Sequence, residues 1–135
     1  MRMLLEEALM QSAGAARKTL LITEDDLAHG ELLSEAIRQE TPYFPLVVQT
    51  GTRALEVVEH IKPDLFILDY YLTDMNGLQL YDQLHAKPGL EAVPALLLSA
   101  SLERHRQEIE QRHILGLAKP FDLDELFALL QQVFV

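Results

Sequence analysis

The chain has no cysteine, and its basic residues are outnumbered by acids. Without cysteine, disulfides, thiol catalysis and thiolate zinc sites are excluded, and the absence fits a reducing cytoplasm. The formal charge of -10 argues against non-specific binding to nucleic acid or to anionic membrane, because both rely on basic surface. No apolar run is long enough to span a bilayer, and Glu6 and Glu7 interrupt the N-terminal stretch that a secretory signal would need. We therefore expect a soluble, cytoplasmic protein with neither nucleic acid nor membrane among its partners.

The length and composition suit one globular domain with an extension before it. The chain has 135 residues, of which 49% are hydrophobic and 24% are charged. We expect a domain at residues 19–135 and an N-terminal extension at residues 1–18. Apolar residues recur in the extension at helical spacing, at Leu4, Leu5, Ala8 and Leu9. They predict a short helix packed on its own domain or a frayed tail, or else a helix that joins two chains in a homodimer. Short isolated helices are marginally stable without packing partners, which favours the first pair of readings.

From residue 19 onward, short apolar runs alternate with helical patterns. The apolar runs predict strands at residues 19–22, 46–50, 64–69, 95–100 and 114–118. The helical patterns lie at residues 27–40, 52–61, 78–86, 102–112 and 122–135. Nearly continuous apolar strands are what a parallel sheet covered on both faces requires. The sequence therefore predicts an α/β fold, a three-layer flavodoxin-like sandwich with a five-stranded parallel sheet and five helices, plus the N-terminal helical extension.

Polar side chains follow several of the predicted strands. They are Glu24 and Asp25 after the first, Asp69 at the end of the third, Ser99 after the fourth and Lys119 after the fifth. The carboxyl ends of parallel strands share one edge of the sheet. Two carboxylates about 4 Å apart repel by roughly 4 kcal/mol at an effective dielectric of 20, so clustered acids need a cation. Oxygen ligands without histidine or cysteine favour Mg²⁺.

The remaining two side chains of this edge suit phosphate. Lys119 offers a compact positive charge, and Ser99 offers a hydroxyl donor. Each of these residues is a weak signal alone. An acid after a strand is usually a helix N-cap, as we expect for Asp26, and both serine and the Lys-Pro dipeptide are common in turns. Their joint placement predicts a phosphoryl-transfer site.

Residues from about 18 to the end resemble the receiver domain of bacterial two-component response regulators, in its stand-alone, single-domain form. The matching stretches are LLITEDD, PDLFILDYYLTDMNG, VPALLLSAS and LAKPFDLDEL. The resemblance implies that Asp69 accepts a phosphoryl group from phosphohistidine on a sensor histidine kinase or a histidine phosphotransfer protein. It also implies that Mg²⁺ is held by Glu24, Asp25, Asp69 and the backbone carbonyl of Tyr71.

The resemblance carries further expectations. Ser99 and Lys119 would bind the phosphoryl oxygens, and the Lys119–Pro120 peptide bond would be cis. The chain would not be a metabolic enzyme but would catalyse its own phosphorylation and slow dephosphorylation. It would pass its signal to a downstream protein target through the last two helices and the fifth strand, because no output domain follows the last helix.

Three features depart from the family pattern. Gly116 stands where the family usually has tyrosine or phenylalanine three positions before the lysine, which puts an aromatic switch in doubt. The segment between Ser99 and Lys119 is short, so the helix at residues 102–112 or its exit loop is expected to be trimmed. Tyr71 lies two positions after Asp69, beside the path of an attacking water, and we expect its bulk to slow hydrolysis of the aspartyl phosphate.

Two other functions fit part of the sequence pattern. A receiver-like binding module that signals without phosphorylation would fit Gly116 and the short helical segment. A module that carries out no phosphoryl transfer, however, has no need for the complete set of acids, Ser99 and Lys119. A Mg²⁺-dependent phosphatase with an aspartate nucleophile needs a second acid two residues later, where this chain has Tyr71.

The five histidines are scattered without metal-ligand spacing, and we expect His29 and His113 to face solvent.

Overall fold

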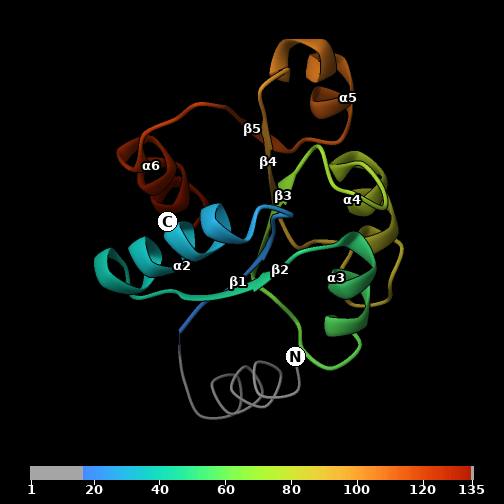
Figure 1. Cartoon of the computed structure of the whole chain (residues 1–135). Coiled ribbons are helices and arrows are strands. Elements are labelled where there is room, and N and C mark those ends of the chain that lie inside the picture. The colour runs from blue at the N-terminus through green and yellow to red at the C-terminus, as the bar shows by residue number, and fades with distance from the viewer. Residues whose placement is uncertain (1–16, 135) are drawn as a thin grey trace.

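The computed structural model describes residues 17–134, and it has the predicted sheet of five parallel strands (Figure 1). The helix predicted for the N-terminal extension lies outside the described residues. The strands are β1 (Thr19–Thr23), β2 (Phe44–Val48), β3 (Leu65–Asp69), β4 (Ala95–Ser99) and β5 (Leu115–Ala118). Their order in the sheet is β2-β1-β3-β4-β5. The chain therefore reverses its direction of winding at β1 and β3, which is where sheets of this kind carry their sites.

Within residues 17–134, five α-helices cover the two faces of the sheet. They are α2 (Leu27–Glu40), α3 (Gly51–Val57), α4 (Gly77–His85), α5 (Arg106–Gln111) and α6 (Leu123–Val133), and the 3-10 helix η1 (Leu102–His105) precedes α5. In Figure 1, α2 and α6 lie on one side of the sheet, and α3, α4 and α5 lie on the other. Among the helices of the described region, none has both the length and the apolar composition needed to cross a membrane. The three-layer prediction is confirmed.

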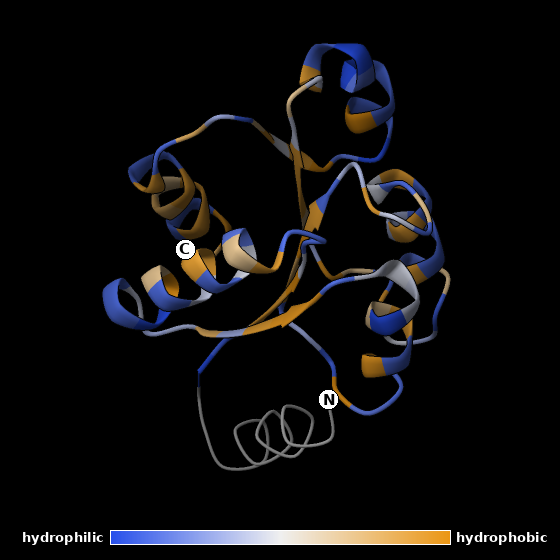
Figure 2. Ribbon diagram, in the orientation of Figure 1, coloured by the Kyte–Doolittle hydropathy of each residue, from blue (hydrophilic) through white to orange (hydrophobic). Residues whose placement is uncertain are grey.

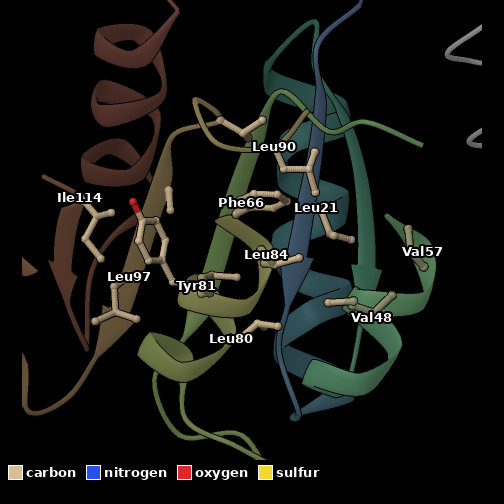
Figure 3. Packing of buried hydrophobic residues seen from close by; sticks show 14 of the residues in the cluster. Leu21, Val48, Val57, Phe66, Leu80, Tyr81, Leu84, Leu90, Leu97 and Ile114 are labelled. Carbon is tan, nitrogen blue, oxygen red and sulfur yellow. The ribbon is translucent and has the colours of Figure 1, made fainter. Parts of the chain in front are cut away.

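Two hydrophobic cores fix the helices to the sheet, one on each face. Successive residues of a strand point to opposite faces, so Leu20 packs with α2 and α6 while Leu21 packs with α3 and α4. Figure 3 shows the core that contains Leu21, in which Phe66 of β3 lies near Leu84 of α4, and Tyr81 of α4 lies near Leu97 and Ile114. Hydrophobic colour concentrates along the sheet and on the inward sides of the helices in Figure 2. Every residue of β1, β3 and β4 is buried, so the site residues at their tips sit on a rigid support.

Strand β2 begins two residues earlier than the sequence predicts. Phe44 and Pro45, which lie outside the predicted strand, are buried and pair with β1. A proline is tolerated here because β2 is an edge strand and needs no donor on its outer side. Gln49 and Thr50, predicted as strand, instead lead into α3, where the Thr50 side chain accepts a hydrogen bond from Arg53 N–H.

Two helices are shorter than their sequence patterns predict. Helix α3 ends at Val57, and the chain then tightens into turns with bonds from the N–H of Glu59 to Glu56 O and of His60 to Val57 O. The pattern at residues 102–112 divides into η1 and the six-residue α5. Ile109 is the one buried residue of α5 and η1 has none, so little apolar burial supports a regular helix there.

Candidate functional site

The predicted site residues meet at the carboxyl edge of the sheet. Glu24 directly follows β1, Asp69 ends β3, Ser99 ends β4 and Lys119 directly follows β5. Lys119 Nζ lies 2.8 Å from Asp69 Oδ1 and 3.4 Å from Glu24 Oε1. Ser99 is fully buried at the tip of β4, the strand between β3 and β5. The topology thus brings side chains from distant parts of the sequence into one pocket.

Three carboxylates form what we call the acidic pocket, Glu24, Asp25 and Asp69. One oxygen from each lies within 4.8 Å of the others. Glu24 and Asp69 are only 1% and 5% exposed, so water screens their repulsion poorly. An all-oxygen donor set of this kind, with one lysine to offset the negative charges, fits a hard divalent cation such as Mg²⁺.

The environment of the acidic pocket shifts the pKa values of its three carboxyl groups. Burial raises the pKa of Asp69 to about 6, with the Lys119 ammonium opposing the shift and the Glu24 carboxylate adding to it. Burial and the neighbouring Glu24 also raise the pKa of Asp25. Burial would likewise raise the pKa of Glu24, but hydrogen bonds from His29 and the Asp26 N–H, together with Lys119, lower it overall. At neutral pH Asp69 is therefore mostly an anion, as a nucleophile must be.

His29 belongs to this site, and it faces solvent, as predicted, only in part. Its Nδ1 contacts Glu24 Oε1, and its side chain is about one-third exposed. Glu24 Oε2 accepts a hydrogen bond of 3.2 Å from the Asp26 N–H, so both oxygens of the buried carboxylate have partners. His29 lies in the first turn of α2, which faces back toward the loop after β1. His113 is exposed as expected.

A chain of hydrogen bonds leads from Ser99 to the rim of the pocket. The Ser99 hydroxyl oxygen accepts from the Ser101 N–H at 2.9 Å, and the Tyr71 hydroxyl donates to Ser101 Oγ at 3.3 Å. The side chain of Tyr71 is about half exposed. Tyr71 therefore connects the loop after the nucleophile with the loop after Ser99. The Lys119–Pro120 peptide bond is cis, as predicted.

The space beside Gly116 is taken by a residue of η1. A Cβ atom built on Gly116 would lie 2.8 Å from Leu102 Cδ1. Near Leu102, the ring of His105 stacks on the ring of Tyr70 with a centroid distance of 3.9 Å. Tyr70 directly follows Asp69 in the chain. Leu102 of η1 thus occupies the space beside the β5 position where the resemblance implies an aromatic residue.

Comparison with known proteins gives one consistent result. A family model described as Response regulator receiver domain matches residues 20–131. The chain is 31% identical over 126 residues to the probable transcriptional regulatory protein TcrX of Mycobacterium tuberculosis, covering 87% of this chain and 50% of TcrX. It is 29% identical over 109 residues to a protein-glutamate methylesterase/protein-glutamine glutaminase of Gluconobacter oxydans, covering 79% of this chain and 30% of that protein. The chain thus spans half or less of the length of these curated relatives.

Solved structures show the same fold. A response regulator receiver domain (CheY-like) from Methylobacillus flagellatus superimposes with a TM-score of 0.80 and 27% sequence identity, covering 87% of this chain and 99% of that one. The chemotaxis response regulator CheY4 of Vibrio cholerae gives a TM-score of 0.79 at 23% identity, over 87% of this chain and 99% of that one.

Proposed function

The chain belongs to the response regulator receiver domains of two-component signal transduction, and from that membership we propose that Asp69 is its phosphoacceptor. The observation that carries the proposal is the position of Lys119 Nζ, 2.8 Å from Asp69 Oδ1, beside two further carboxylates. This arrangement supplies a nucleophile, a counter-charge and a set of metal ligands at one point. We assign the receiver domain to residues 19–135 and treat residues 1–18 as an extension.

The proposed reaction is transfer of a phosphoryl group from phosphohistidine. An Asp69 carboxylate oxygen attacks phosphorus, a P–O bond forms, and the P–N bond breaks with its electron pair passing to the imidazole nitrogen. Positioning and charge neutralisation supply most of the rate enhancement in such transfers. The pKa of Asp69, about 6, leaves the attacking oxygen unprotonated at neutral pH. Slow attack by water on the aspartyl phosphate would later return the free carboxylate.

The other pocket residues stabilise the transferred group. Lys119 exchanges its contact with Asp69 for one to a phosphoryl oxygen, and the Ser99 hydroxyl donates to another. Mg²⁺ held by Glu24, Asp25, Asp69 and the backbone carbonyl of Tyr71 would neutralise charge on the same oxygens.

The proposed partners are of two kinds. A sensor histidine kinase or a histidine phosphotransfer protein donates the phosphoryl group, and a downstream protein target reads the phosphorylated state. We propose that the target contacts the face formed by α5, β5 and α6, which lies beside the Lys119 edge of the pocket. This face includes the segment whose short η1 and α5 differ from the predicted single helix.

The proposal is tested by labelling with a small-molecule phosphodonor in the presence of Mg²⁺, followed by intact mass measurement. The parent protein should gain the mass of one phosphoryl group, and chelation of the metal should prevent the gain. Asp69→Asn should gain nothing, while the matched variant Asp124→Asn, at an exposed position of α6, should label like the parent. A parent protein that takes no label, either from this donor or from a phosphohistidine protein, would instead favour the binding module that works without phosphorylation.

A further inference from the structure

The loop between β3 and α4 is closed at its base. Tyr71 and Asn76 form an isolated antiparallel bridge, and the N–H of Gly77 donates to Tyr70 O at 2.8 Å. A Cβ atom on Gly77 would lie 2.6 Å from Asp69 O, so the two ends of the loop approach as closely as glycine allows. This loop carries the Tyr71 carbonyl that the proposed function assigns to Mg²⁺. The shape of the loop therefore decides where that ligand lies.

The tip of the same loop is tied to a different element, the first turn of α3. Asp74 Oδ1 accepts a hydrogen bond of 3.0 Å from the Gly51 N–H. Asp74 Oδ2 accepts from the Thr52 N–H at 2.9 Å and from the Thr52 hydroxyl at 2.7 Å. The slight burial of Asp74 would raise its pKa, but these hydrogen bonds lower the pKa overall. Asp74 is therefore ionised at neutral pH, and hydrogen bonds to a charged acceptor are stronger than those to a neutral one.

The residue after Asp74 fits closely against the same turn of α3. A Cβ atom on Gly51 would lie 2.5 Å from Met75 Sδ, and Gly51 is buried. Helix α3, to which the tip is tied, lies beside α4, which the loop enters (Figure 1). The tip of the loop is thus held by three hydrogen bonds and by packing, while Asp74 itself lies outside the acidic pocket.

We propose that Asp74 is a positioning residue for the metal site, because its tie to Gly51 and Thr52 holds the β3–α4 loop in the conformation in which Tyr71 binds Mg²⁺. The inference rests on the proposed function, since it takes the Tyr71 carbonyl as a metal ligand. Coupling between two binding events is reciprocal. Because the tie favours the loop that binds metal, metal binding strengthens the tie by the same factor and tightens the first turn of α3.

Three variants of the full chain separate this role from a simple effect of charge. Asp74→Asn keeps the shape of the side chain but replaces one accepting oxygen with a donor. Thr52→Val removes one hydrogen bond of the tie from the α3 side without changing the charge. Asp124→Asn removes the same charge as Asp74→Asn, but from an exposed position in the first turn of α6, and is the control.

Titration with Mg²⁺, followed by amide chemical shifts, measures the affinity of each variant. Asp74→Asn should weaken Mg²⁺ binding by about three- to tenfold, less than the loss of a group that contacts a ligand directly. Thr52→Val should weaken it in the same direction by a smaller factor, and Asp124→Asn should bind like the parent. At saturating Mg²⁺, Asp74→Asn should gain the phosphoryl mass at the parental rate. A merely structural role would lower the free energy of unfolding and leave the metal affinity unchanged.

Amide exchange with water, measured by NMR, tests the reciprocal effect in the parent protein. Saturating Mg²⁺ should slow exchange of the Gly51 and Thr52 amides by about three- to tenfold. The Glu125 amide, which the Asp122 side chain holds at the start of α6, is the control and should exchange at an unchanged rate.

Two results would overturn the inference and leave Asp69 standing as the phosphoacceptor. They are equal Mg²⁺ affinities in the parent and Asp74→Asn, and exchange of the Gly51 and Thr52 amides that does not respond to Mg²⁺. A parent protein that binds no Mg²⁺ would overturn both the inference and the metal site on which it rests.

Discussion

His29 Nδ1 contacts Glu24 Oε1 and so joins the first turn of α2 to the least exposed carboxylate of the acidic pocket. Because an ionised carboxylate can only accept, the histidine nitrogen is the donor. Glu24 is also held by Lys119 and by the Asp26 N–H. Its orientation toward Asp25 and Asp69 is therefore set by three groups, two at the start of α2 and one directly after β5.

Removing the imidazole should weaken metal binding. We expect His29→Ala to lower the affinity for Mg²⁺ by about tenfold, because groups that orient ligands are typically worth that much. Titration of the protein with Mg²⁺, followed by amide chemical shifts, measures the affinity. His113→Ala, at an exposed position, is the control and should bind like the parent. Equal affinities in both variants would show that His29 does not position Glu24.

The raised pKa of Asp69 has a consequence for stability without metal. The pKa of the Asp69 carboxyl is about 6 in the folded state and has its usual lower value in the unfolded state. At every pH at which this carboxyl is ionised, it therefore destabilises the fold. Asp69→Asn should therefore raise the free energy of unfolding at pH 8 in the presence of a chelator, by about 1–3 kcal/mol. The gain should shrink as the pH falls below 6 and vanish near pH 4, about where the unfolded carboxyl also takes up its proton.

Urea unfolding of the parent and Asp69→Asn at several pH values measures this difference. Added Mg²⁺ should reduce or reverse it, because the metal stabilises the parent pocket. A variant that is less stable than the parent at pH 8 without metal would mean that the contact with Lys119 outweighs burial and the repulsion from Glu24.

An aromatic residue at position 116 should conflict with η1. The Cβ position of Gly116 is already 2.8 Å from Leu102 Cδ1, so Gly116→Tyr must displace Leu102 and should cost about 1–3 kcal/mol of stability. Combining it with Leu102→Ala should recover part of the loss, which a double-mutant cycle from urea unfolding would measure as a coupling energy. Strictly additive losses would show that Leu102 does not occupy this space.

Tyr71 should slow the loss of phosphate from Asp69. Its ring stands at the rim of the pocket and its hydroxyl is tied to Ser101, so we expect Tyr71→Ala to speed hydrolysis roughly several-fold by admitting water. Tyr71→Phe keeps the ring and should stay close to the parent rate. The decay of the phosphorylated mass with time gives both rates. Loss of phosphate from Tyr71→Ala no faster than from the parent would count against this role.

The sheet and most of the site could be predicted because each depends on local patterns. Continuous apolar runs marked the buried strands, and the parallel topology then required Glu24, Asp69 and Lys119 to share an edge. His29 was missed because its role depends on how the first turn of α2 faces the loop after β1, which no spacing rule states. The contact between Gly116 and Leu102 could not be predicted either, because it depends on the division of one expected helix into η1 and α5.

Reduction of the phosphorylated protein with borohydride tests the central claim most directly. Borohydride converts an aspartyl phosphate to homoserine, and mass spectrometry of the peptide containing residues 64–77 locates the change. The peptide containing Glu24 and Asp25 is measured in the same way. Our account predicts conversion at Asp69 alone, dependent on Mg²⁺ and absent from Asp69→Asn. Conversion at Glu24 or Asp25 instead, or a labelled residue that persists at the parental level in Asp69→Asn, would contradict it.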